Sequence, residues 1–136
     1  MAFDNFELYA AKFAEHSPLW DEGKTSGDCF QRAAYFMLAN NDKEPQPTLV
    51  HAQVRESTTG EWIDHAWCEI PAEATYEDGS EGPIVIVVDG TQPDPNARFI
   101  PREIHVEKVV RRDRREFTFE QMVEMARRFA HDGPWR

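Results

Sequence analysis

Residues 84–88 form an uninterrupted run of β-branched side chains, IVIVV, which constrains the fold more than any other stretch of the chain. Branching at Cβ favours extended backbone and disfavours helix. Asp89 and Gly90 follow directly and are typical of the end of a strand. We therefore expect a sheet in which this segment is a central strand.

Two further segments are predicted to be strands of the same sheet. Residues 48–54 and 61–70 are rich in strand-forming side chains, and Thr58–Gly60 between them is predicted to be a hairpin turn, so the two strands should be antiparallel. Residues 103–117 alternate in places and indicate a charged edge strand. Residues 71–83 are acidic and are predicted to be an exposed loop, and residues 91–101 are irregular.

Helices are predicted on both sides of this strand region. Residues 4–16 and 28–39 repeat apolar side chains at helical spacing, and Ser26 or Asp28 is the expected cap of the second helix. Thr118 and Gln121 have the spacing of a capping box, and Gly133-Pro134 should end the last helix. This order predicts one α+β domain over residues 1–136, with an antiparallel sheet of three to five strands, two N-terminal helices and a C-terminal helix packed on it.

The composition limits the classes of partner and the cellular compartment that we expect for this protein. The chain has 136 residues and a formal net charge of −10, which disfavours nucleic acid as a partner. Its apolar runs are shorter than the ~20 residues that cross a bilayer, and its first residues lack the pattern of a signal peptide, so we expect a cytoplasmic protein and no membrane partner. Charged runs at residues 73–81 and 102–115 are expected to be solvated.

A cysteine, a histidine and an aspartate follow one another at element boundaries or within a strand. Cys29 falls in the first turn of the second predicted helix, where the helix dipole favours the thiolate. His65 lies within a strand, and Asp89 lies at the end of the next one. If His65 faces the helix that carries Cys29, alternation sends Cys68 to the other face and excludes it as the nucleophile. A thiol, an imidazole and a carboxylate in this order indicate nucleophilic acyl chemistry.

Three motifs around these residues resemble those of the transglutaminase-like superfamily, within the papain-like cysteine fold. They are residues 27–34 (GDCFQRAA), residues 64–69 (DHAWCE) and residues 87–91 (VVDGT). In the superfamily a helix-borne Cys is followed by a His-Ala-Trp-x-Glu strand and an Asp-Pro-Thr corner. The resemblance covers roughly residues 25–92 and departs at Gly90, where proline is usual. The short interval from Cys29 to His65 is similar to that of the small bacterial and phage members.

The resemblance implies a papain-like fold and a Cys29–His65–Asp89 catalytic triad that acts on an amide bond of a protein or peptide, with no cofactor. Cys29 would form a thioester, His65 would protonate the leaving amine and Asp89 would orient the imidazole. Trp20 is a candidate second oxyanion donor beside the backbone N–H of Cys29. Trp67 is a candidate substrate contact that shields His65 from water.

Two alternatives use the same residues. The first is a catalytically inactive module that binds a protein or peptide in its groove. The second is a zinc site made of Cys29, His65 and Asp89, with or without His51, which is disfavoured because the chain has no Cys-x-x-Cys pair. If there is no zinc site, His51 is expected to be a hydrogen-bonded structural residue. No function is predicted for His105. The acyl acceptor, the substrate and the oligomeric state remain open at this stage.

Overall fold

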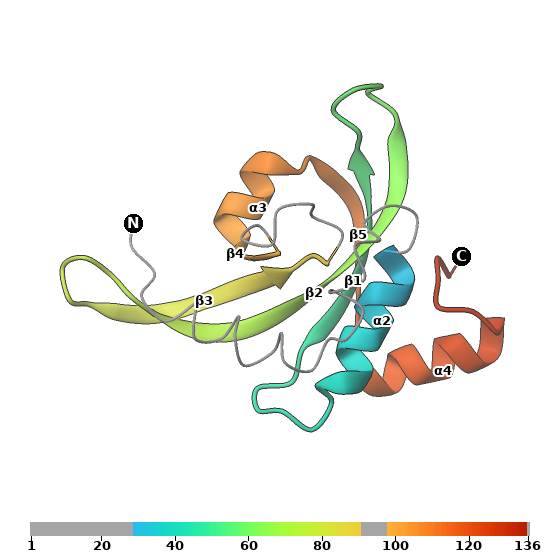
Figure 1. Cartoon of the computed structure of the whole chain (residues 1–136), viewed down its shortest axis with the longest axis horizontal. Coiled ribbons are helices and arrows are strands. Elements are labelled where there is room, and N and C mark those ends of the chain that lie inside the picture. The colour runs from blue at the N-terminus through green and yellow to red at the C-terminus, as the bar shows by residue number, and fades with distance from the viewer. Residues whose placement is uncertain (1–28, 91–97, 136) are drawn as a thin grey trace.

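A five-stranded antiparallel sheet forms the middle of the domain (Figure 1). The computed structural model describes residues 29–90 and 98–135, in which the strand order is β4-β3-β2-β1-β5. The strands are β1 (Thr48–Arg55), β2 (Trp62–Thr75), β3 (Glu81–Val88), β4 (Phe99–Pro101) and β5 (Arg111–Phe117). With three helices, this arrangement confirms the expected α+β class and antiparallel sheet.

The β-branched run lies in β3, which is hydrogen-bonded to β2 on one side and to β4 on the other. Its interior position is the one predicted. The sequence prediction of a loop over residues 71–83 is wrong, because β2 continues to Thr75 and β3 already begins at Glu81. Pro71 lies beyond the part of β2 that pairs with β1, and Pro83 lies beyond the part of β3 that pairs with β4. Both prolines therefore sit where a strand edge is free, and a free edge tolerates proline.

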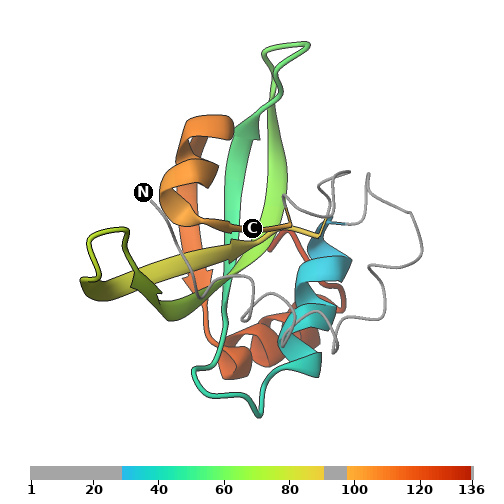
Figure 2. The ribbon, with the colours of Figure 1, turned by 60° about the vertical axis from the view of Figure 1, so that its left-hand side comes forward.

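Helices cover both faces of the sheet (Figure 2). Helices α2 (Cys29–Ala39) and α4 (Phe119–Phe129) pack on the face that carries Leu49, Ala66 and Cys68. The opposite face carries Val50 and Trp67, and it is covered by α3 (Arg102–Lys108) and the residues that follow it. The sheet therefore has apolar side chains on both faces and separates two layers.

Helix α4 begins as the sequence predicts and ends earlier. Thr118 and Gln121 form the full capping box, with each side chain accepting a hydrogen bond from the other's backbone N–H. The helix ends at Phe129, and Ala130 adopts a left-handed conformation with φ of 60°. The predicted stop at Gly133 is therefore wrong. The segment after α4 instead turns back toward α2 and buries Trp135 completely.

The alternation of side chains predicted one edge strand over residues 103–117. The structure shows that this segment is not a single strand. Helix α3 (Arg102–Lys108) comes first, and only β5 forms the predicted edge strand. Pro101 precedes the helix, and proline is common where a helix begins. The first predicted helix, over residues 4–16, and the cap at Ser26 or Asp28 lie outside the described residues.

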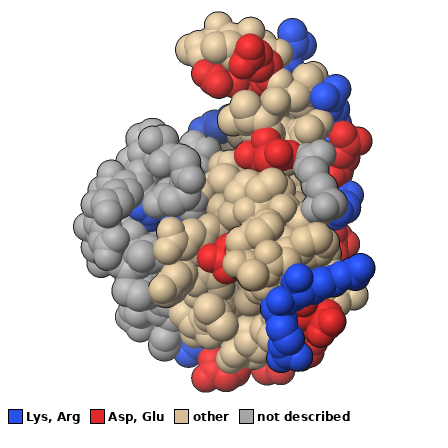
Figure 3. All heavy atoms as spheres, turned by 90° about the vertical axis from the view of Figure 1, so that its right-hand side faces the viewer, with Lys and Arg blue, Asp and Glu red and all other residues tan. Residues whose placement is uncertain are grey.

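Charges of both signs occur on the surface. On the face to the right of Figure 1, uncharged side chains occupy most of the middle, with acidic side chains among them, and acidic and basic side chains lie next to one another along the edge (Figure 3). No helix in the described part of the chain is long and apolar enough to cross a membrane.

Candidate active site

A hydrogen bond joins His65 on β2 to Asp89 at the end of β3. Nε2 of His65 lies 3.0 Å from Oδ2 of Asp89, and the carboxylate is completely buried. Burial alone lowers the pKa of His65, but the charge and the hydrogen bond of Asp89 outweigh it, and with a smaller contribution from Cys29 they raise this pKa to about 10. The imidazole is therefore protonated at neutral pH.

Cys29 completes a chain of three groups. The structure describes α2 from Cys29 onward, and the sequence predicts Cys29 in the first turn of this helix; its side chain is partly buried, and its interaction with His65 contributes to raising the pKa of that imidazole. Because Asp89 occupies Nε2 of His65, Nδ1 is the ring nitrogen left for the Cys29 sulfur. The three residues singled out in the sequence thus lie together in the order Cys29, His65, Asp89.

Cys29 interacts with His65 although α2 and the His65 side chain lie on opposite faces of the sheet. His65 pairs with Ala52 and Trp67 pairs with Val50, so these side chains lie on the face opposite α2. The expectation that His65 faces the helix of Cys29 is therefore wrong. Strand β3 ends at Val88, opposite Cys68, so β2 has no neighbouring strand on that side of His65 among the described residues.

Cys68 lies under α2 and is fully buried. Its thiol donates to the backbone carbonyl of Ala33 at 3.3 Å. Burial raises the pKa of the Cys68 thiol, and the nearby charges of Glu69 and Asp89 raise it further. This environment keeps Cys68 protonated, so it does not compete with Cys29 as a nucleophile.

Trp67 packs beside the histidine and does not reach the surface. Its ring centroid lies 5.9 Å from that of His65, and only 1% of the residue is exposed. Its indole N–H donates to Oε2 of Glu69 at 3.0 Å. A direct substrate or oxyanion contact by Trp67 does not fit this geometry, whereas shielding of His65 does. Trp20, the other such candidate, lies outside the described residues.

Glu69 is the centre of a buried charge cluster beneath Trp67. Its carboxylate accepts hydrogen bonds from Arg102 at 2.7 Å and from Arg114 at 2.6 and 2.8 Å. Burial raises the pKa of Glu69, but the bonds from Arg114, Trp67 and Arg102 outweigh this and lower the pKa to about 2. The prediction that the basic stretch is simply solvated is therefore wrong for these two arginines.

His105 is a site residue that the sequence prediction missed. Its side chain is 1% exposed, and its Nε2 lies 3.5 Å from Oδ2 of Asp89. Its Nδ1 is in contact with Nη2 of Arg111, and its ring stacks against Trp67 at 5.0 Å. The only available signal was Pro101, whose position predicts a helix start rather than a strand.

His51 lies on the opposite face of the sheet from His65. Its ring packs against Trp135, Phe30 and Phe117 at centroid distances of 4.7, 4.8 and 5.0 Å. Neither ring nitrogen has a hydrogen-bond partner among the described residues, which overturns the expected hydrogen-bonded role. Burial, and then the charge of Arg115, lower the pKa of His51 to about 4.

The zinc alternative places the metal on Cys29, His65 and Asp89, with or without His51. Because the ring of His51 lies on the other face of the sheet, it does not approach Asp89. Within residues 29–90 and 98–135, no group of three or more His, Cys, Asp and Glu side chains is placed so that it could hold a metal ion.

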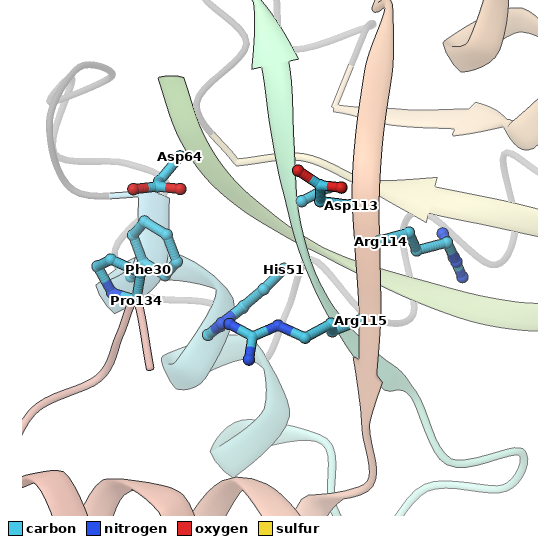
Figure 4. A pocket seen from close by; sticks show the side chains of 8 residues that line it. Phe30, His51, Asp64, Asp113, Arg114, Arg115 and Pro134 are labelled. Carbon is cyan, nitrogen blue, oxygen red and sulfur yellow. The ribbon is translucent and has the colours of Figure 1, made fainter. Parts of the chain in front are cut away.

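A cavity of about 430 Å³ is lined by chain neighbours of Cys29 and His65, although neither Cys29 nor His65 itself lines it. Phe30 and Asp64, the chain neighbours of these two residues, lie on its wall (Figure 4). His51 and Arg115 project to the same side of the strands, whereas Arg114 points away to the other side. The complete lining is Phe30, His51, Ala52, Asp64, Asp113, Arg114, Arg115 and Pro134.

Comparison of the chain with models of known protein families, with characterised proteins and with solved structures gave no match.

Proposed function

We propose that the protein is a cysteine-dependent hydrolase or acyltransferase that cleaves an amide bond of a protein or peptide through a thioester. The observation that supports this most is the hydrogen bond from His65 to the buried Asp89, together with the interaction of Cys29 with the same imidazole. The resemblance of the three motifs to the transglutaminase-like superfamily leads to the same chemistry. The papain-like fold is part of this proposal.

Acylation uses the thiolate of Cys29 and the proton of His65. The sulfur attacks the amide carbon, and the C–N bond then breaks as Nδ1 of His65 gives its proton to the leaving amine. The raised pKa of His65 means that this proton is already on the ring at neutral pH. Asp89 holds the ring by Nε2, so that Nδ1 faces the sulfur and the leaving group.

Deacylation reverses the proton transfer. Water or an amine attacks the thioester carbon and gives a proton to Nδ1 of His65, and the C–S bond breaks to restore the thiolate of Cys29. The backbone N–H groups in the first turn of a helix have no partner within the helix, so that of Cys29 is a donor for the oxyanion formed in both steps.

Acyl electrophiles test this proposal directly. The purified protein is incubated with activated esters and thioesters of short peptides, and adducts are mapped by mass spectrometry of peptides. We expect an acyl group on Cys29 that is lost on addition of hydroxylamine, since thioesters are labile to it. Cys29→Ser should form no thioester, and His65→Ala should form it more slowly. Acylation at lysines with none at Cys29 would contradict the proposal and favour a binding module.

A further inference from the structure

Two imidazoles face the same oxygen of Asp89. Nε2 of His65 lies 3.0 Å from Oδ2. Nε2 of His105 lies 3.5 Å from the same atom, which is longer than an N–H···O hydrogen bond, and it has no hydrogen-bond partner among the described residues. Both the Asp89 carboxylate and His105 are fully buried. The backbone N–H of Asp89 also donates to the carbonyl of Arg98 at 2.9 Å. The backbone of Asp89 is therefore fixed by a hydrogen bond, and the imidazole rings of His65 and His105 approach its carboxylate.

Arg111 determines which nitrogen of His105 carries the proton. A guanidinium is only a donor, so the Nδ1 atom that contacts Nη2 of Arg111 must be the acceptor. A neutral imidazole with a bare Nδ1 has its proton on Nε2, which is the atom that faces Asp89. Burial and the charge of Arg111 both favour the neutral ring, because they lower the pKa of His105. The contact with Arg111 thus turns the N–H of His105 toward the carboxylate.

Trp67 keeps these groups in place. The ring of His105 packs on Trp67 at 5.0 Å, and the guanidinium of Arg111 lies over the same indole at 4.8 Å. His65 packs beside Trp67 at 5.9 Å. One fully buried aromatic ring therefore contacts both histidines and the arginine.

We propose that His105 is a positioning residue, fixed by Arg111 in its Nε2–H tautomer, that holds the Asp89 carboxylate in the orientation that binds His65. This proposal rests on the proposed function, in which Asp89 orients the His65 ring. The titratable and charged groups around the cluster are Asp89 after β3, Cys29 on α2, Glu69 on β2, Arg102 on α3, and Arg111 and Arg114 on β5.

The tautomer of His105 can be measured in the wild-type protein. In ¹⁵N-labelled protein near neutral pH, the two ring nitrogens of a neutral histidine have well-separated chemical shifts, and His105→Gln identifies the signals. We expect His105 to be neutral with its proton on Nε2. A ring protonated on Nδ1 alone, or on both nitrogens, would overturn the proposal without any variant having to fold.

The effect on His65 is measured by its NMR titration in three variants. In His105→Leu the carboxylate loses the N–H that approaches it, so the titration midpoint of His65 should fall by about half to one pH unit, less than a full hydrogen bond to a charged group would supply. His105→Gln keeps an N–H at the position of Nε2 and should restore most of the wild-type midpoint. Arg111→Met leaves His105 and Trp67 in place and should lower the midpoint less than His105→Leu does.

An unchanged or higher midpoint in His105→Leu would overturn the proposal, because simple packing would leave the titration where it is. The same follows if His105→Gln behaves like His105→Leu. The failure of the proposed function is a separate result, namely wild-type Cys29 reactivity that does not depend on His65. The NMR titrations of His65 test whether His105 positions Asp89, whether or not Cys29 proves to be catalytic.

Discussion

Oδ2 of Asp89 lies 3.0 Å from Nε2 of His65, so the end of β3 fixes the orientation of a ring on the neighbouring strand. The bond forms between a fully buried carboxylate and a ring that is 13% exposed. A charge pair shielded from water in this way has a strong effect on protonation. The pair is also the part of the site that a single substitution tests most cleanly.

Asp89→Asn keeps the shape of the side chain and removes its charge. Because Asp89 is the main cause that raises the pKa of His65 to about 10, the variant should titrate His65 at about 6.5 or below, where burial alone would place it. The measurement is the NMR titration of the His65 ring. Asp42→Asn, at an exposed position, should leave the midpoint unchanged. A midpoint in Asp89→Asn that stays close to the wild-type value would contradict the assignment.

Two histidines should give the protein a stability maximum near pH 6.5. The pKa of His65 is raised to about 10 in the folded state, so its contribution is complete below pH 6.5 and is lost as the pH rises toward 10. The pKa of His51 is lowered to about 4, so its contribution is complete above pH 6.5 and is lost as the pH falls toward 4. Urea unfolding across this range checks both predictions.

Single variants separate the two histidines. His65→Gln should flatten the alkaline side of the stability curve, and His51→Leu should flatten the acid side. The result against this account would be an acid or alkaline slope that both variants leave intact.

Glu69→Gln should destabilise the fold by about 2–3 kcal/mol. The substitution removes the buried charge that binds Arg102 and Arg114, and the exposure of the two arginines keeps the loss below that of a fully buried pair. Glu116→Gln is the matched control, because Glu116 contacts the same Arg114 but is 56% exposed, and it should cost less than about 0.5 kcal/mol. Equal losses of unfolding free energy in urea for the two variants would refute the role of burial.

Gly133→Ala should release the segment after α4 from α2. Gly133 has φ of +126°, and an added Cβ would lie 2.6 Å from Cδ1 of Phe30 and 2.7 Å from Cε1 of His51. We expect a cost of roughly 1–3 kcal/mol and a change in tryptophan fluorescence, because Trp135 is buried by this contact. Gly79→Ala also requires positive φ but meets no atom within 4 Å, so it should cost less and leave the fluorescence unchanged.

Local signals in the sequence predict much of the sheet and one end of each long helix. The β-branched run, the Gly60 turn and the Thr118 capping box depend on neighbouring residues only, and they are confirmed. The extension of β2 past Pro71 was missed because it depends on where β1 ends, which is a property of the sheet.

The candidate site shows the same division between local and tertiary information. Alternation correctly groups His65 with Trp67, but it does not determine which face of the sheet the helix of Cys29 covers. His105 was missed because a seven-residue helix is too short for a clear apolar period, and its contact with Asp89 brings together residues from separate elements.

The pH dependence of Cys29 alkylation tests the central claim most directly. Native protein is treated with iodoacetamide at about pH 6, where an ordinary thiol is almost entirely protonated, and labelling is followed by mass spectrometry of peptides. We predict that wild-type Cys29 reacts at least about tenfold faster than Cys29 in His65→Ala, while the buried Cys68 stays unlabelled in both proteins. Equal labelling of Cys29 in the two proteins, at the rate of a simple exposed thiol, would contradict the proposed thiolate–imidazolium pair.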